Sequence, residues 1–365
     1  MKFPDTVTVA EMDRFDEIID VRSPVEFAED HVPGAASYPV LDDAERAEVG
    51  TLHKQVSPFA AKIRGAALIS KRIGGHIESD FGRRPKEWRP LVYCWRGGKR
   101  SSALQHVLRE IGWQAATLEG GYKAYRRAVL SQLEILPREH HYLVVCGETG
   151  SAKSRILEAI AIHGGQVLDL ERLANHRGSV LGHPSGSAQP GQRMFDSLLW
   201  KELRALDPSR PVFVESESKK VGELHMPDSL MRSMRQSACI LIAAPVAARV
   251  EFLLREYQHF VNDPQSLHNR LELLATLYPR EVIARWQTQA SAGRWAEFVE
   301  DMLANHYDPA YRRSMDRNFS RLPEASVVTL DRLDQESIND AARRIIAATA
   351  NHLSRPTQNQ TGDAC

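Results

Sequence analysis

Cysteine is scarce in this chain, and long apolar runs and a net charge are missing from it. The 365 residues include 4 cysteines and no CxxC pair, so the sequence predicts neither a disulfide framework nor a cysteine-bound zinc site. No run of about 18 apolar residues occurs, so no membrane-spanning helix is expected. The N-terminal segment lacks the apolar core of a signal peptide, and we expect a protein of the reducing cytoplasm.

The balance of charge leaves the class of partner open. Lys and Arg together number 47, as do Asp and Glu, so the formal net charge is zero. A neutral total neither predicts nor excludes a nucleic-acid partner, because it can conceal a basic face. The hydrophobic share of 42% and the charged share of 26% are typical of a globular protein, and 365 residues predict two domains.

Short apolar runs alternate with helix-like segments in two blocks, which predicts an α/β fold. In the first block, residues 100–112 have the apolar period of a helix that ends at Gly112. A linker around Pro137 opens the second block, and from Val246 onward the chain reads as mostly helical. Buried strands are expected at residues 17–23, 91–94, 142–146, 166–170, 211–216 and 239–245.

Cys94 stands at the end of one expected strand, before a loop and a helix. The loop WRGGK can turn its backbone N–H groups inward because it holds two glycines, and the helix adds the positive end of its dipole. Together with nearby Arg and Lys charges, these features lower the pKa of a thiol and favour the thiolate. The same loop would hold an oxyanion. We predict that Cys94 is catalytic and that the anion is bound by Arg96, Gly97, Gly98, Lys99, Arg100 and Ser101.

Other interpretations of this cysteine stay open. It can be an inert strand-end residue, although the cationic loop behind it disfavours that. The spacing C-x5-R-S from Cys94 to Ser101 is also the signature of cysteine-dependent phosphatases. A nucleophile beside an anion cradle fits attack on a phosphate. It equally fits capture of sulfur or a heavier chalcogen from an anionic donor.

A phosphate loop with one departure follows the strand at 142–146. GETGSAKS matches the pattern G-x-x-x-x-G-K-[ST] at Gly147, Lys153 and Ser154, but Ala152 replaces the second glycine. Backbone N–H groups of such a loop bind two linked phosphates, the lysine reaches the outer one, and the serine can bind Mg²⁺. We predict diphosphate binding by Gly147, Thr149, Gly150, Ser151, Lys153 and Ser154.

Two carboxylates follow the expected strand at 211–216. Glu215 and Glu217 stand where P-loop proteins place an acidic residue that assists the metal ion. Mg²⁺ is therefore a candidate ligand, and the sequence indicates no tightly bound cofactor. Each carboxylate can instead be a solvated loop residue, and an ordinary strand–turn–helix is the alternative to the phosphate loop.

The first block resembles rhodanese domains, which carry sulfur on a cysteine as a persulfide. The resemblance rests on DVRSPVEFAEDHVPGA, on the cysteine loop and on LEGGYKAYR. The usual rhodanese loop is one residue shorter, which implies that the loop here admits a larger group at Cys94. Within this resemblance, Asp20, Arg22 and His31 belong to the framework of the fold.

A rhodanese-like domain fused to a P-loop domain is similar to the tRNA 2-selenouridine synthase family. The strings CWRGGKRS, GETGSAKS, LANHRGSVLG, QPGQRMFDSLLW and VESESKKVG carry the match, within Asp20 to Gly222. Ala152 departs from the family pattern, as does ESESKK, where an arginine usually follows the serine. The resemblance implies that selenium from selenophosphate replaces the sulfur of wobble 2-thiouridine in tRNA, after S-geranylation with geranyl diphosphate. Cys94 would carry the selenium as a selenosulfide, and the phosphate loop would bind geranyl diphosphate.

The motifs and the linker together predict four segments. They are a rhodanese-like domain at 8–134, a P-loop α/β domain at 140–245, a helical C-terminal part at 246–354 and a disordered tail at 355–365. Contacts with tRNA or substrate are expected at His176, Arg177, Lys219 and Lys220.

Two further functions remain as alternatives. One is a Cys-dependent phosphatase or another sulfurtransferase with a nucleotide-binding P-loop domain. The other is a non-enzymatic tRNA- or nucleotide-binding protein whose P-loop has decayed, which only Ala152 favours. The oligomeric state and the set of tRNAs stay open.

Overall fold

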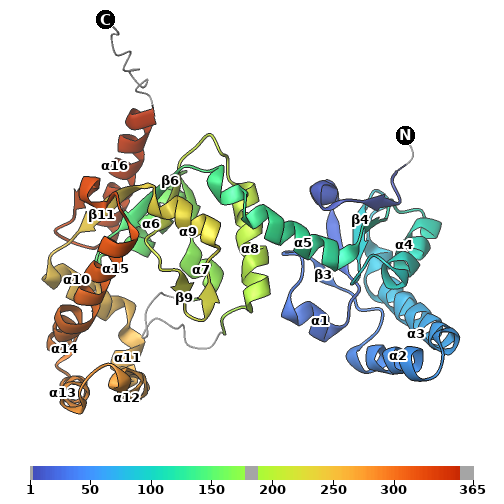
Figure 1. Ribbon diagram of the computed structural model, residues 1–365, viewed down its shortest axis with the longest axis horizontal. Helices are drawn as coiled ribbons and strands as arrows, with labels where there is room; N and C mark the ends of the chain where they lie inside the picture. Colours follow the sequence, from blue (N-terminus) through green and yellow to red (C-terminus); the bar gives the residue numbers. More distant parts are fainter. Residues whose placement is uncertain (1–2, 177–187, 354–365) are drawn as a thin grey trace, which may run out of the picture. The chain divides into compact units, whose positions relative to one another are not determined.

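The computed structural model describes residues 3–176 and 188–353, which form two compact units (Figure 1). Unit 1 consists of Met1–Leu133 and Pro190–Lys201, and unit 2 of Glu134–Gln189 and Glu202–Cys365. The segment Pro190–Lys201 therefore lies inside the range predicted for the second domain but packs with unit 1. The tail predicted to be disordered lies outside the described residues.

The sheet of unit 1 has five parallel strands in the order β1-β5-β4-β2-β3. β4, which precedes the cysteine loop, lies at its centre and is buried along its whole length. Val92 packs in the core with Leu104 and Leu108 of the following helix. The strands are β1 (Thr6–Val7), β2 (Glu17–Asp20), β3 (Ala36–Ser37), β4 (Pro90–Tyr93) and β5 (Ala116–Leu118).

The helices of unit 1 include a long pair between β3 and β4, for which the sequence pattern gave no assignment. A serine, Ser57, caps the second helix of the pair by accepting a hydrogen bond from the N–H of Ala60. The helices are α1 (Pro24–Glu29), α2 (Asp43–Gln55), α3 (Pro58–Ser79), α4 (Lys99–Ile111), α5 (Gly121–Leu133) and the first part of α8 (Gln192–Ala205).

A buried ion pair supports the framework of unit 1. Arg22 is 1% exposed, and its Nη2 donates to Asp20 at 2.7 Å and to the carbonyl of Asp30 at 2.6 Å. Its guanidinium also lies 4.1 Å from the ring centroid of Tyr122. The ring of His31 donates from Nδ1 to the carbonyl of Phe27 in α1 at 2.9 Å. These partners fit the framework role expected for Asp20, Arg22 and His31.

The sheet of unit 2 also has five parallel strands, in the order β12-β11-β6-β8-β7. β6, which precedes the phosphate loop, is the central strand, and α6 and α16 pack against the core beneath it. The strands are β6 (Tyr142–Cys146), β7 (Gln166–Leu168), β8 (Val212–Glu215), β11 (Ala238–Ala243) and β12 (Ser326–Thr329), with a small hairpin of β9 (Lys220–Val221) and β10 (Leu224–His225).

The C-terminal part of unit 2 is helical apart from β12. The sequence pattern did not single out this strand, because SVVT is only four residues long and lies at the exposed edge of the sheet. The helices of unit 2 are α6 (Lys153–Ile162), α7 (Leu170–Ala174), the end of α8, α9 (Asp228–Arg235), α10 (Val246–Glu256), α11 (Gln258–Asn262), α12 (Pro264–Glu272), α13 (Arg280–Ser291), α14 (Trp295–Met302), α15 (Asp308–Asn318) and α16 (Gln335–Leu353).

Two parallel sheets covered by helices confirm the predicted α/β fold. Across residues 3–176 and 188–353, every helix is too short or too polar to cross a membrane. In each unit the central strand ends at a glycine-bearing loop that opens a helix. These two loops hold Cys94 and Lys153, the side chains predicted to act in catalysis and diphosphate binding.

Candidate functional site

The cysteine loop of unit 1 folds around its own sulfur. Sγ of Cys94 accepts hydrogen bonds from the N–H of Gly98 and from Oγ of Ser101, both at 3.2 Å. Cys94 follows β4, and Ser101 lies in the first turn of α4, which begins at Lys99. The strand end, the loop and the helix start therefore converge on the thiol, as the sequence predicted.

The pKa of Cys94 lies below the ordinary value of a thiol. Burial raises it, but hydrogen bonds from the Ser101 hydroxyl and from the backbone N–H groups of Ser101, Gly98 and Arg96 outweigh the burial and lower it. The direction agrees with the sequence prediction. The backbone N–H groups act as predicted, the Ser101 hydroxyl adds a further hydrogen bond, and hydrogen bonds rather than nearby cations are the main causes of the lowered pKa.

The cations of the cysteine loop are either paired with a carboxylate or exposed to solvent. Arg100 is bound to Glu26 with 2.9 Å between Nη1 and Oε2. Burial raises the pKa of Glu26, but the hydrogen bond and charge of Arg100 outweigh it and bring the value to about 2. Arg96 and Lys99 are exposed beside the loop. They are placed to meet an anion that approaches from solvent.

The start of α5 holds the cysteine loop in place. The N–H of Tyr122 donates to the carbonyl of Cys94 at 2.8 Å, and the N–H of Lys123 donates to that of Trp95 at 3.1 Å. Gly121 has φ +58, and a Cβ there would lie 2.2 Å from the carbonyl oxygen of Cys94. Only glycine permits this approach, which explains the GGY of the LEGGYKAYR string.

The phosphate loop of unit 2 connects β6 to α6 and contains a strained residue. Ala152 has φ 61 and ψ 27, the left-handed conformation that favours glycine, and it is buried. Nζ of Lys153 donates to the carbonyl of Gly147 at 2.6 Å, and the N–H of Gly147 donates to the hydroxyl of Tyr311 at 2.6 Å. The loop thus has the backbone shape of a phosphate loop although an alanine stands in the glycine position.

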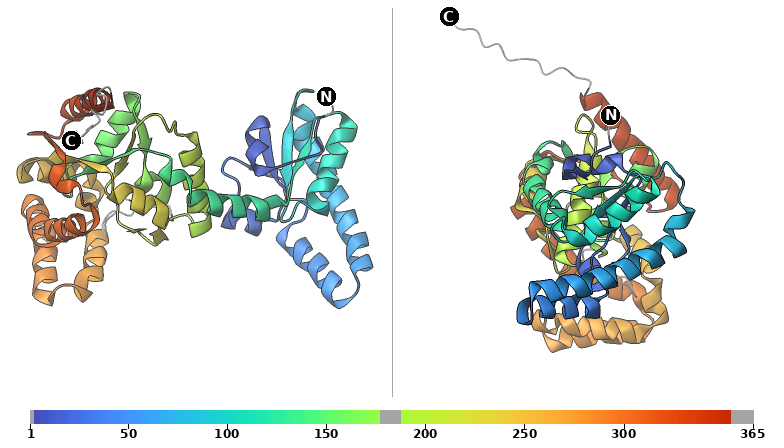
Figure 2. Two further views of the ribbon diagram at one scale, coloured as in Figure 1. Left: turned by 45° about the horizontal axis from the view of Figure 1, so that its top comes forward. Right: turned by 90° about the vertical axis from the view of Figure 1, so that its right-hand side faces the viewer.

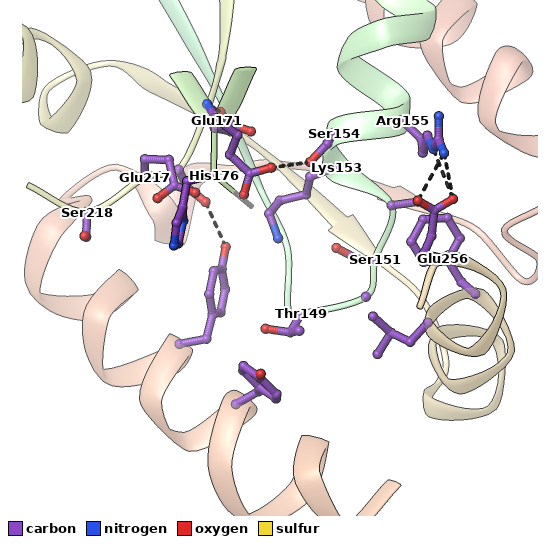
Figure 3. A pocket seen from close by; sticks show the side chains of 18 of the residues that line it. Thr149, Ser151, Lys153, Ser154, Arg155, Glu171, His176, Glu217, Ser218 and Glu256 are labelled. Atoms are coloured by element: carbon purple, nitrogen blue, oxygen red, sulfur yellow. Dashed lines mark hydrogen bonds and ion pairs between the residues drawn. The ribbon is translucent and has the colours of Figure 1, made fainter. Parts of the chain in front are cut away.

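A cavity of about 590 Å³ opens beside the phosphate loop (Figure 3). Figure 3 shows Lys153, Glu171 and Glu217 pointing into the same space. The hydroxyl of Ser151 is buried and finds no hydrogen-bond partner among the described residues, although it lines this cavity. The loop residues that line the cavity are Thr149, Gly150, Ser151, Ala152, Lys153 and Ser154.

Three carboxylates gather on one side of this cavity. Ligand atoms of Glu171, Glu215 and Glu217 lie within 4.8 Å of one another. Burial, followed by the charge of Glu217, raises the pKa of Glu171 to about 7, and burial is also the main cause of the raised pKa of Glu215 and of Glu217. Oγ of Ser154 donates to Glu171 at 3.0 Å. Carboxylate and hydroxyl oxygens of this kind fit Mg²⁺.

Glu171 was missed by the sequence analysis. It lies in α7 just after β7, so the sheet topology brings it to the same edge as Glu215, which ends β8. Its N–H donates to Oε1 of Glu215 at 2.8 Å. The signal available was an acidic residue close behind a predicted strand, at the edge where parallel strands place their ligands.

The helical part of unit 2 reaches the phosphate loop through Arg249, which is 1% exposed. Its guanidinium contacts Glu148 at 2.6 Å, Asp308 at 2.5 Å and the carbonyl of Thr149 at 2.9 Å. The second loop residue and the backbone of the third are therefore fixed by α10 and α15. Sequence reasoning had no signal for this, because the partners lie about a hundred residues away.

A smaller apolar pocket of about 70 Å³ adjoins the cavity. The two spaces share Thr149, Leu253, Tyr257 and Tyr307, which places the mouth of the apolar pocket beside the phosphate loop. Its other lining residues are Leu254, Phe260, Val261, Leu267, Trp295, Phe298, Val299, Met302 and Leu303.

The residues predicted to contact tRNA or substrate separate in the structure. His176 lines the cavity. Arg177 lies outside the described residues. Lys219 pairs with Asp228 at 2.7 Å and Lys220 lies 3.4 Å from Glu223, and neither lysine lines the cavity.

Comparison with known proteins covers both units. Residues 7–128 match the model of the rhodanese-like domain, and residues 140–273 match that of the tRNA 2-selenouridine synthase AAA domain. A tRNA 2-selenouridine synthase of Nitrosomonas europaea is 35% identical over 292 residues, covering 76% of this chain and 74% of that protein. A tRNA 2-selenouridine synthase of Alcanivorax borkumensis is 32% identical over 332 residues, covering 82% of this chain and 90% of that protein. A tRNA 2-selenouridine synthase of Nitrosomonas eutropha is 36% identical over 251 residues, covering 66% of this chain and 62% of that protein.

Proposed function

This chain belongs to the tRNA 2-selenouridine synthase family, and from that premise we propose that it replaces the sulfur of wobble 2-thiouridine in tRNA with selenium from selenophosphate. A geranyl group is first transferred from geranyl diphosphate to that sulfur. The protein is then a transferase of the reducing cytoplasm, where Cys94 stays a free thiol. The two loops divide the work between them.

The first transfer belongs to the phosphate loop. The sulfur of 2-thiouridine attacks C1 of geranyl diphosphate, so that a carbon–sulfur bond forms and diphosphate leaves. Lys153 and the loop N–H groups stabilise the negative charge that develops on the leaving group. Glu171, Glu215, Glu217 and Ser154 would hold Mg²⁺, which supplies further charge neutralisation when it is bound. Before this, the ligand must displace the Lys153 contact with the carbonyl of Gly147.

The observation that carries this assignment is the apolar pocket beside a phosphate loop. Across the residues that line it, its walls are aliphatic, aromatic or methionine side chains apart from Thr149. An isoprenyl chain suits such walls, because burying it removes apolar surface from water. A nucleotide base would leave its ring nitrogens and exocyclic groups without hydrogen-bond partners there. The apolar lining therefore supports geranyl diphosphate over ATP as the ligand, and the walls must move apart to admit a ten-carbon chain, because the pocket measures about 70 Å³.

The second transfer belongs to the cysteine loop. If the Cys94 thiolate took selenium directly, the phosphorus of selenophosphate would leave as phosphite, a reduced product. Attack on phosphorus needs no redox change: the sulfur–phosphorus bond forms, the phosphorus–selenium bond breaks and selenide leaves. Selenide then attacks C2 of the alkylated base, geranyl thiol leaves, and water releases phosphate from Cys94. We favour this route over the selenosulfide implied by the resemblance, and it suits the C-x5-R-S spacing.

The direct test uses the full-length protein and tRNA that carries 2-thiouridine. Geranyl diphosphate should convert that nucleoside to its S-geranyl form, and selenophosphate should then yield 2-selenouridine, as followed by mass spectrometry of digested tRNA. Excess ATP should not compete with the first step. An unchanged 2-thiouridine signal with both substrates present would refute the proposed function. Turnover of a simple phosphomonoester in place of tRNA would favour the phosphatase alternative.

A matched pair of variants tests the apolar pocket. Val299 is half-buried in its wall, so Val299→Phe should narrow the space and lower geranyl transfer at least about tenfold. Val246→Phe places the same ring at a residue that is 42% exposed and outside the pocket, and should leave transfer unchanged. Both variants should convert pre-geranylated tRNA as the wild type does.

A further inference from the structure

The α2–α3 hairpin of unit 1 extends beyond the parallel sheet (Figure 2). The two helices pack on each other and join through Val56 and Ser57. None of its residues takes part in the cysteine loop. The hairpin is therefore a feature that the proposed chemistry leaves unexplained.

The hairpin carries cations and, along most of its length, no carboxylate. Between Glu48 and Glu78 the sequence contains neither Asp nor Glu. Two arginines of this stretch are paired: Arg64 with Glu48, and Arg72 with the start of α2. The remaining cations, which have no ion-pair partner among residues 3–176 and 188–353, are Lys54, Lys62 and Lys71.

Its tip exposes three apolar side chains close together. Val56 is 68% exposed, Phe59 is 72% exposed and Ile63 is 60% exposed. A single exposed apolar residue is ordinary, whereas three within one turn region form a patch that implies a partner. Lys54 precedes the patch in the sequence and Lys62 adjoins Ile63, so its partner should carry both a flat apolar group and negative charge.

The exposed face of α3 includes several residues with small side chains or none. It carries Ala66, Ala67 and Ser70, followed by two adjacent glycines, Gly74 and Gly75. Glycine inside a helix costs about 1 kcal/mol relative to alanine. A Cβ built at either glycine would meet nothing within 4 Å, so the packing of unit 1 does not require them. Small residues at this face permit close approach by a backbone from another molecule.

We propose that the α2–α3 hairpin is a docking arm for tRNA, an inference that rests on the proposed function in taking tRNA as the substrate. The unpaired lysines neutralise phosphates, and the small residues on the exposed face of α3 let the RNA backbone come close. The ring of Phe59 stacks on an unpaired base, because sequence-specific RNA sites are single-stranded loops with bases turned outward.

Three basic side chains outside the hairpin are already paired with carboxylates, unlike the hairpin lysines. Arg84 is paired with Glu17 at 2.9 Å, and Lys219 with Asp228 at 2.7 Å. Arg126 is held by Asp196 within unit 1. A cation already matched to a carboxylate adds little net attraction for a polyanion. The stretch 49–77 of the hairpin, which contains no carboxylate, is therefore better suited to RNA than these three sites.

The main experiment measures binding of tRNA to the full-length protein at several salt concentrations. The variant with Lys54→Gln, Lys62→Gln and Lys71→Gln should bind roughly 10- to 100-fold more weakly near 0.1 M salt. The slope of log K against log salt should become shallower by about 2 to 3, since each lost phosphate contact lowers it by nearly one. The control removes three exposed charges that are paired with carboxylates in unit 2, with Arg332→Gln, Arg343→Gln and Arg344→Gln, and should keep the wild-type slope.

A second pair of variants tests stacking. Phe59→Ala should weaken tRNA binding about 5- to 100-fold with no change in the salt slope, because the ring carries no charge. Ile162→Ala, which truncates an apolar side chain that is 77% exposed in unit 2, should bind as the wild type does. Circular dichroism and thermal melting should show every variant folded, because the altered side chains are on the surface.

Failure of this inference is distinct from failure of the proposed function. If the wild type makes 2-selenouridine while the triple variant keeps the wild-type affinity and salt slope, the docking arm is wrong and the function stands. If Phe59→Ala leaves tRNA affinity unchanged but abolishes binding to phosphatidylglycerol vesicles, or dissociates a dimer, the patch serves a membrane or a second copy instead. Conversion measured at saturating tRNA should be unchanged in the variants, since neither catalytic loop is altered.

Discussion

The cysteine loop and the phosphate loop are built alike and hold their anion sites differently. Each follows the central strand of a parallel sheet and opens a helix. In the cysteine loop the N–H of Gly98 points at the sulfur of the same loop. In the phosphate loop the N–H of Gly147 is taken by Tyr311, a residue of α15. In the first loop the donors to the sulfur come from the loop and the helix that it opens, whereas in the second a distant helix supplies the partner of the loop N–H.

This difference shows how one structural device serves two chemistries. When a cysteine sulfur accepts the hydrogen bonds of the loop, the loop stabilises the thiolate, which is a nucleophile. When the N–H groups of the loop are bonded to side chains that a ligand can displace, the loop can bind that ligand. We expect changes within the cysteine loop to alter reactivity, and changes far from the phosphate loop to alter its stability.

The largest effect on product formation should come from replacing Cys94 in the cysteine loop or Lys153 in the phosphate loop. Cys94→Ser should make S-geranyl-2-thiouridine and accumulate it, with no 2-selenouridine, because a hydroxyl is a far weaker nucleophile than the thiolate. Lys153→Ala should lose geranyl transfer by about 10²-fold or more, because the leaving diphosphate loses its cation. Nucleoside mass spectrometry separates the products.

The same two variants test whether geranyl transfer and selenation occur at separate loops. Pre-geranylated tRNA should restore 2-selenouridine to the Lys153→Ala variant and not to Cys94→Ser. Should Cys94→Ser lose geranyl transfer as fully as Lys153→Ala while remaining folded, the two loops would form one composite site.

The dependence of the phosphate loop on distant residues should appear as stability. Arg249→Gln leaves Asp308 without its cation in a buried setting, while Glu148 keeps the exposed Arg312, and it should lower the free energy of unfolding by about 3–5 kcal/mol. The control Arg285→Gln removes a half-exposed arginine paired with Asp301 and should cost about 1 kcal/mol or less. Denaturant unfolding measures both. Equal effects of the two variants would argue against a structural role for the Arg249 cluster.

Hydrogen bonding, rather than cations, should control the cysteine. Ser101→Ala removes a donor to Sγ and should raise the pKa of Cys94, because the thiolate loses a hydrogen bond that stabilises its charge. The thiolate fraction near neutral pH then falls, so selenation should slow and recover as the pH is raised. Arg100→Ala should shift the pKa less, because its guanidinium is paired with Glu26. Thiolate absorbance against pH, with Cys94→Ser as the blank, decides between them.

The smallest effect concerns the strained alanine of the phosphate loop. Ala152→Gly should stabilise the protein by up to about 1 kcal/mol, because glycine adopts φ 61 without the clash that an alanine Cβ makes. Ala161→Gly, at an exposed position of the same helix, should destabilise it by about 1 kcal/mol. Thermal unfolding should show the opposite signs. A destabilising Ala152→Gly would mean that the buried methyl group contributes more than the strain costs.

Local patterns in the sequence were sufficient for the two loops. The strand before each loop, the glycines within it and the helix after it are neighbours along the chain, so their arrangement follows from residues a few positions apart. For that reason the α/β fold and the positions of Cys94 and Lys153 behind the two central strands could be predicted, whereas their roles stay predictions. The unfavourable position of Ala152 was visible too, because the phosphate-loop pattern specifies glycine there.

Long-range contacts decided the rest. Arg249 reaches Glu148 across 101 residues, and Tyr311 reaches Gly147 across 164. Strand order alone brings Glu171 beside Glu215, and only packing of the helical part creates the apolar pocket. No periodicity encodes such pairs, because each depends on where two segments lie after the chain has buried its core. The sequence by itself determined which groups could react, and the tertiary structure decided which side chains surround them.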